Sequence, residues 1–137
     1  MAAPGVEISL QISGLTVVHT HGPSGSQIKT VPPKDNGGDG STFSPTDLLA
    51  TSLASCALTT MALQASRESL TWGAASAKVV KVMSGLPRRV ESLALDITMP
   101  RDVKPEHRAR LEEIARGCPV ARSLHPDVKV PMTFTYP

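Results

Sequence analysis

The feature that most constrains this chain is a run of apolar and small residues over positions 44–66. Ser44, Pro45 and Asp47 form an N-terminal helix signature. The serine hydroxyl can accept a hydrogen bond from the Asp47 amide, proline tolerates the first helical position, and the carboxylate suits the helix dipole. Apolar side chains occupy every face, and no charge lies between Asp47 and Arg67. The run therefore predicts a helix that begins near Pro45 and is buried all round.

Such a helix needs more cover than one chain of this size provides. A sheet from the same chain covers only one of its faces, and a second copy would cover the rest, so we predict an intimate homodimer. A membrane span is not expected, because hydroxyl and amide side chains dilute the hydrophobicity of the run. These polar residues are Thr51, Ser52, Ser55, Thr59, Thr60 and Gln64.

Length and charge restrict the class of protein. A chain of 137 residues is expected to form a single domain over 1–137. Its formal charge is +2, and its basic residues are not interleaved with aromatic ones, which argues against a nucleic-acid partner. The N-terminus has no apolar core of the signal-peptide type, so a cytoplasmic location is expected. In that reducing compartment two free thiols or a redox pair are expected in preference to a structural disulfide.

The first third of the chain predicts an antiparallel meander. Residues 6–18 have the alternation of a strand, with Gly14 breaking the run, and residues 15–19 could continue as a second strand. Residues 22–25 favour a turn, and residues 27–31 form a third short strand. Residues 32–43 have no periodicity and predict a loop. This loop is either a flexible glycine-rich connection or a ligand-contacting segment that leads into the helix.

The second half alternates strand-type and helix-type patterns, with an irregularity expected near Ser92. The fold class is therefore α+β, with helices packed on antiparallel or mixed sheet. The expected elements are strands over 77–83 and 89–99, a helix over Pro105–Arg116 ended by Gly117, a short helical turn through Leu124, and a strand over 128–136.

Two motifs in this arrangement resemble the OsmC/Ohr family, and specifically its OsmC-like branch. The first is Ser-Pro-Thr-Asp-Leu-Leu-Ala-Thr-Ser-Leu-Ala-Ser-Cys-Ala-Leu-Thr-Thr-Met-Ala-Leu at 44–63, preceded by Gly-Gly-Asp-Gly-Ser at 37–41. The second is Cys-Pro-Val-Ala-Arg-Ser-Leu at 118–124, followed by Val-Lys-Val at 128–130. The resemblance covers nearly the whole chain in element order.

The resemblance implies an intertwined homodimer in which mixed sheets wrap two long central helices. It also implies a thiol-dependent peroxidase of the oxidative and osmotic stress responses, which reduces organic hydroperoxides, is recycled by an external dithiol and uses no cofactor. Cys56 would be the peroxidatic residue and Cys118 the resolving one. This pairing makes chemical sense, because a thiolate attacks the O–O bond and a second thiol traps the resulting sulfenic acid as a disulfide.

The sequence departs from the characterised peroxidases at the group that ionises the thiol. A thiol among apolar side chains stays protonated and inert, so a nearby cation is needed. In those relatives an N-terminal arginine, held by a glutamate at the helix start, supplies it. This chain has no arginine before Arg67, and Thr46 stands at the place of the glutamate.

Several residues could compensate. Lys29 or Lys34 could supply the charge with Asp47 as its anchor, although a lysine lacks the planar fork of arginine. Alternatively, Arg116 or Arg122, close to Cys118 in sequence, could reach Cys56. Plainer roles are equally available: Asp47 as a helix cap, the arginines as a solvated face, and the cysteines as small buried apolar groups.

Two functions from different classes follow. The first is the two-cysteine peroxidase, in which Phe43 and the leucines near Cys56 favour fatty or aromatic hydroperoxides over hydrogen peroxide. The second is a dimeric scaffold that binds a small hydrophobic or thiol ligand without turnover. A metal site is not expected, because His19 and His21 share one side of a strand but have no further ligands close by in sequence.

Overall fold

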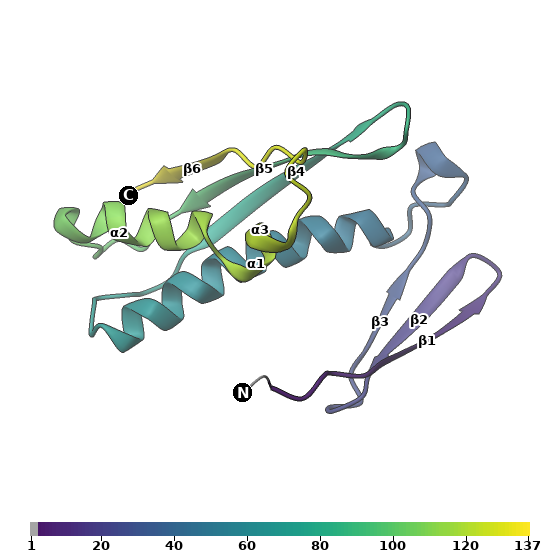
Figure 1. Ribbon diagram of the computed structural model, residues 1–137, viewed down its shortest axis with the longest axis horizontal. Coiled ribbons are helices and arrows are strands. Elements are labelled where there is room, and N and C mark those ends of the chain that lie inside the picture. The colour runs from purple at the N-terminus through teal and green to yellow at the C-terminus, as the bar shows by residue number, and fades with distance from the viewer. Residues whose placement is uncertain (1–2) are drawn as a thin grey trace. The chain divides into compact units, whose positions relative to one another are not determined.

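The computed structural model describes residues 3–137 and contains two compact units, Met1–Leu48 and Leu49–Pro137. Each unit is described by itself, and Figure 1 labels the elements of both. Both units contain a three-stranded sheet. Helices and sheets together confirm the α+β class expected from the sequence.

The first unit is the predicted antiparallel meander. Strands β1 (Ile8–Ser13), β2 (Thr16–His21) and β3 (Gln27–Thr30) pair in chain order (Figure 1). Gly14 has a positive φ of 59° in the turn that divides β1 from β2, a conformation that costs glycine little because it has no Cβ. The predicted run over 6–18 is thus two strands of one hairpin.

One face of this sheet is apolar and exposed. Ile8, Leu10 and Ile12 alternate along β1, and the strand pairing places Ile28 of β3 on the same face, with His19 of β2 between Leu10 and Ile28. Ile28 is 51% exposed and Ile12 68% exposed. A sheet face that exposes several large apolar side chains is typical of a surface that another protein surface covers.

The loop over 32–43 is folded by its own hydrogen bonds. It contains the short 3-10 helix η1 (Lys34–Asn36), and the Gly38 amide donates to the Pro33 carbonyl at 2.9 Å. Gly38 packs so closely on Pro32 that a Cβ would lie 1.8 Å from the Pro32 carbonyl oxygen. The pKa of Asp39 is lowered, chiefly because its carboxylate accepts a hydrogen bond from the Ser41 amide.

Helix α1 (Pro45–Arg67) begins where the sequence predicted. The Asp47 amide donates to the Ser44 hydroxyl at 3.1 Å, and the Ser44 amide donates to the Asp47 carboxylate at 2.8 Å. These reciprocal bonds form a capping box, which satisfies two amides that the helix itself cannot. Asp47 is therefore a helix cap, which was one of the two roles predicted for it.

The expectation that α1 is buried all round is wrong for the single chain. Only one stripe along the helix is buried, while Leu63 is 49% exposed. The residues of this buried stripe are three to four positions apart, the spacing of a single helix face. Within residues 3–137, α1 is the one helix long and apolar enough to cross a membrane, with a hydropathy of 1.4, a test that the core helix of a globular protein also passes. The buried stripe consists of Ala50, Leu53, Ala57, Met61 and Ala65.

The second unit contains a mixed sheet in the order β4-β5-β6 (Figure 1). Strands β4 (Ser76–Ser84) and β5 (Arg89–Thr98) pair antiparallel. Val82 pairs with Ser92 and Met83 with Val90, which makes Glu91 the extra residue of a bulge and confirms the irregularity expected near Ser92.

Strand β6 (Met132–Thr135) runs parallel to β5 and is shorter than the predicted strand over 128–136. The chain before it follows β5, since the Lys129 amide donates to the Glu91 carbonyl at 3.0 Å. Pro131 then interrupts the ladder, because proline has no amide hydrogen to donate. The sequence pattern located the segment and overestimated its length.

Two further helices complete this unit. Helix α2 (Pro105–Arg116) has the predicted bounds, and the short α3 (Pro119–Ser123) is the predicted helical turn. Gly117 ends α2 with a φ of −102°, so the helix stops there without the left-handed turn typical of a glycine cap. Leu111 and Ala115 of α2 join the core that the buried stripe of α1 forms with the inner face of β5.

Side chains of α2 also contact aromatic residues of β6 and of the segment that follows it. The Arg108 guanidinium lies 4.2 Å from the Tyr136 ring centre, and that of Arg116 lies 5.0 Å from the Phe134 ring centre. Between them, the Tyr136 hydroxyl donates to Glu112, and Arg116 forms an ion pair with the same glutamate at 3.5 Å. Burial, followed by the hydrogen bond to Glu112, raises the pKa of Tyr136. The tyrosine therefore stays neutral and keeps donating its proton.

An ion pair ties the end of α1 to α2 and predicts a pH dependence of stability. Arg110 donates to both carboxylate oxygens of Glu68, at 3.2 and 2.7 Å. These bonds, with one from Gln64, lower the pKa of Glu68 from 4.5 to about 2. A lowered folded-state pKa adds stability that is present above 4.5 and is lost as the pH falls towards 2.

We therefore expect Glu68→Gln to unfold at a lower urea concentration than wild type at neutral pH, with the difference shrinking to nothing as the pH falls to about 2. Arg110→Gln should have the same effect, and the double variant should add little to either. A difference between wild type and Glu68→Gln that is constant over this pH range would contradict the assignment.

Candidate functional site

Both cysteines are free thiols of the second unit. Cys56 lies near the middle of α1 and is half-buried, whereas Cys118 is 0% exposed and immediately precedes α3. The chain therefore offers one thiol within reach of solvent and a second thiol beneath the surface.

The Cys118 thiol lies next to Cys56, and its pKa is raised. Burial raises this pKa most, and the Cys56 side chain raises it further through a hydrogen bond and through its charge when ionised. The backbone amides of Ala121 and Val120 at the start of α3 act in the opposite direction. Cys118 is thus held protonated next to Cys56, although the two residues lie in distant parts of the sequence.

A hydroxyl contacts Cys56 from the next turn of its own helix. The Cys56 Sγ and the Thr60 Oγ1 are 3.8 Å apart, a hydrogen-bond distance for sulfur. Positions four residues apart share a helix face. In the sequence Thr60 is one of several polar residues of the run, and its spacing of four residues from Cys56 is the signal that could have predicted this contact.

The arginines considered as partners for Cys56 have other contacts. Arg116 pairs with Glu112 and stacks on Phe134. The Arg122 Nε donates to the Gly117 carbonyl at 2.7 Å, so its guanidinium lies over the backbone beside Cys118. The alternative in which these arginines form a solvated, salt-bridged face describes Arg116 well.

The remaining candidates lie in the first unit, where each has a defined place. Lys29 is exposed on β3 opposite Val18, and Lys34 is exposed in η1 with its stem packed by Gly40. Phe43 is 51% exposed, and its carbonyl accepts from the Val31 amide. The approach of these side chains to Cys56 remains a prediction.

The two histidines of β2 contact hydroxyl groups. His19 hydrogen-bonds with Thr30 at 3.0 Å, and His21 with Ser24. Among residues 3–137, no group of three or more histidine, cysteine, aspartate or glutamate side chains is arranged to hold a metal ion.

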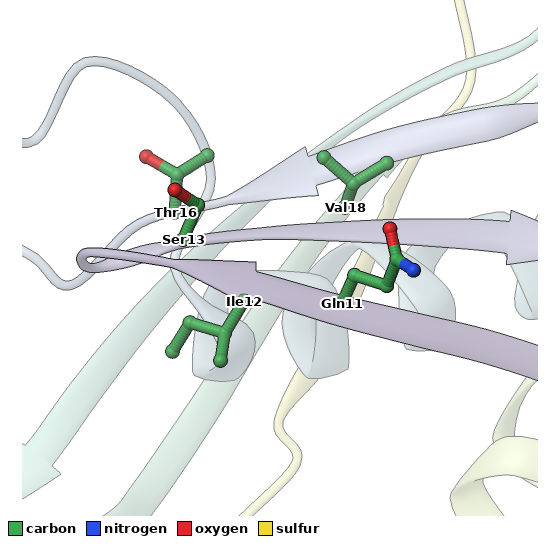
Figure 2. Close-up of a pocket in the computed structure, with 5 residues that line it drawn as sticks. All are labelled: Gln11, Ile12, Ser13, Thr16 and Val18. Atoms are coloured by element: carbon green, nitrogen blue, oxygen red, sulfur yellow. The ribbon is translucent and has the colours of Figure 1, made fainter.

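A hollow of about 400 Å³ lies at the β1–β2 hairpin of the first unit. Figure 2 shows Gln11, Ser13, Thr16 and Val18 on one side of the strands, with Ile12 pointing to the other. None of these five side chains is titratable, so the lining offers no base to activate the Ser13 or Thr16 hydroxyl.

Comparison with known proteins identifies the family. The family model described as OsmC-like protein matches residues 38–133. This range covers most of the chain and contains both cysteines. The chain belongs to the OsmC family. A search of the curated proteins found no match.

Solved structures agree with the OsmC assignment. A Psychrobacter arcticus 273-4 protein, provisionally named as an osmotic stress induced and detoxification response protein, is 36% identical, with a TM-score of 0.85 over 98% of this chain and 97% of that one.

Two more distant structures share the OsmC fold. The organic hydroperoxide resistance protein OsmC of Legionella pneumophila is 16% identical, with a TM-score of 0.78 over 98% and 99% of the two chains. The organic hydroperoxide resistance protein OhrB of Bacillus subtilis is also 16% identical, with a TM-score of 0.71 over 98% and 100%.

Proposed function

We propose that this OsmC family member is a two-cysteine peroxidase that reduces organic hydroperoxides. The observation that carries the proposal is the pairing of a half-buried Cys56 with a fully buried Cys118 that lies next to it. Relatives of the same fold are named organic hydroperoxide resistance proteins, which supports the choice of substrate class.

The proposed reduction of a hydroperoxide has three steps. The Cys56 thiolate attacks the terminal oxygen of the hydroperoxide, the O–O bond breaks, and the alkoxide leaves and takes up a proton as an alcohol. Cys118 then attacks the sulfenic sulfur of Cys56 as it gives up its thiol proton, which leaves with the sulfenic hydroxyl as water, and the disulfide forms. An external dithiol reduces this disulfide by exchange and is itself oxidised to a disulfide.

The different burial of the two cysteines suits these roles. The exposed fraction of Cys56 admits a substrate, while the raised pKa of Cys118 keeps that thiol from reacting with oxidants in solution, since the thiolate is the nucleophile. Cys118 then needs to meet only one electrophile, the sulfenic acid formed beside it.

The second part of the proposal is a homodimer, formed because each unit leaves apolar surface open. In the first unit this is the face of β1 and β3 that carries Ile12 and Ile28, and in the second unit it is the side of α1 that carries Leu63. A second copy is the simplest cover for both surfaces. Light scattering after size exclusion is expected to give twice the chain mass, and a folded monomer would contradict the proposal.

The peroxidase is tested by counting thiols before and after a stoichiometric dose of an aromatic hydroperoxide. Wild type is expected to lose both thiols in one fast step and to form an intramolecular disulfide, found by peptide mass spectrometry under non-reducing conditions. An equal dose of hydrogen peroxide, a small polar oxidant, should react more slowly. Slow, unselective thiol loss with both oxidants would instead favour the ligand-binding scaffold, which the lack of an arginine before Arg67 also favours.

A further inference from the structure

We propose that the Thr60 hydroxyl is a catalytic group that donates a hydrogen bond to the Cys56 thiolate and supplies part of the stabilisation that a cation would provide. The carrying observation is the 3.8 Å contact between Thr60 Oγ1 and Cys56 Sγ. The inference deepens the proposed peroxidase and rests on it for its purpose.

The choice of hydrogen-bond partner distinguishes Thr60 from another hydroxyl of α1. The Ser52 hydroxyl donates to the Leu49 carbonyl at 2.8 Å, a bond from a helical serine back to its own backbone. The Thr60 hydroxyl instead contacts the sulfur of Cys56. A hydroxyl in that position can donate a hydrogen bond to the sulfur, and a thiolate is a stronger hydrogen-bond acceptor than a thiol.

The charged groups of the second unit leave this role open. From α1 itself no charged side chain comes between Asp47 and Arg67. From the α2–α3 junction the groups nearest in sequence are Cys118, which is protonated, and Arg116 and Arg122, which contact Glu112 and the Gly117 carbonyl. A hydrogen bond to the charged form lowers the cost of ionising a partly buried group.

Thr60→Val tests the proposal, because valine keeps the shape of threonine and removes only the hydroxyl. The readout is the rate of Cys56 alkylation by iodoacetamide as a function of pH, with peptide mass spectrometry to separate Cys56 from Cys118. Thr60→Ser keeps the hydroxyl, and Thr59→Val makes the same replacement at the exposed neighbouring position.

We expect Thr60→Val to alkylate roughly tenfold or more slowly at neutral pH, with its pH profile displaced upwards, because hydrogen bonds to charged groups are among the strong ones. Thr60→Ser should stay near wild type, and Thr59→Val should be unchanged. Circular dichroism checks the helix content of each variant, and Thr60→Ala provides the same readout if the valine variant does not fold.

Two results would overturn the inference: alkylation of Thr60→Val within twofold of wild type, or an equal loss in Thr60→Val and Thr60→Ser. Alkylation uses no hydroperoxide, so the two proposals fail separately. Fast turnover of a hydroperoxide by Thr60→Val refutes the role of Thr60 and leaves the peroxidase standing. Slow alkylation of Thr60→Val in a chain that reduces no hydroperoxide supports the hydrogen bond and refutes the peroxidase.

Discussion

Cys56→Ser is expected to abolish hydroperoxide reduction, lowering the rate by on the order of a thousandfold or more, because it removes the sulfur on which every step depends. The hydroxyl that replaces it is not ionised at neutral pH and does not attack an O–O bond. The measurement is consumption of an aromatic hydroperoxide in the presence of a small dithiol. Since Cys56 is half-buried and close in size to serine, the fold should be retained.

Cys118→Ser is the matched control and should behave differently. It keeps the attacking thiol, so a single dose of hydroperoxide should still be reduced and leave Cys56 as a sulfenic acid that a dimedone-type reagent traps. Sustained turnover should fall, because nothing inside the chain then forms the disulfide. Equal activity of wild type and Cys56→Ser would remove the peroxidase proposal, and full turnover by Cys118→Ser would remove the resolving role alone.

Leu53→Ala is expected to destabilise the protein by about 2 to 5 kcal/mol, the range for deleting a fully buried leucine side chain. Leu53 is 0% exposed in the core between α1, the inner face of β5 and α2. The loss combines the transfer free energy of the removed carbons with the cavity left behind. Urea unfolding followed by circular dichroism measures it.

Leu63→Ala is the informative partner, because it makes the same change on the same helix at a side chain that is 49% exposed in the single chain. If a second copy covers this side of α1, Leu63→Ala should weaken the dimer and make the unfolding midpoint depend more strongly on protein concentration. If the helix side stays open, the variant should unfold close to wild type at every concentration. Light scattering on both variants separates these outcomes.

The local structure of this chain follows from its sequence because the signals for it are local. The capping box at Ser44 and Asp47, the alternation along β1 and the bounds of α2 all depend on neighbours within a few residues. The sequence was a poorer guide to β6, where its alternation extends through Pro131 but the missing amide of that residue breaks the ladder.

Full burial of α1 could not be judged from its apolar pattern. The pattern states how much surface must be covered, but not whether the cover comes from the same chain or from another one. In the single chain only the stripe through Leu53 and Met61 is covered.

The candidate site divides in the same way. The sequence by itself determined which two thiols could react and that no charged side chain stands between Asp47 and Arg67 to ionise Cys56. Only the tertiary structure decided that Cys118 lies next to Cys56, that it is the fully buried thiol and has a raised pKa, and that Arg122 contacts the Gly117 carbonyl. The physical reason is that a pKa and a hydrogen bond depend on distance and on the loss of solvent, which residues far apart in the chain acquire only when the core brings them together.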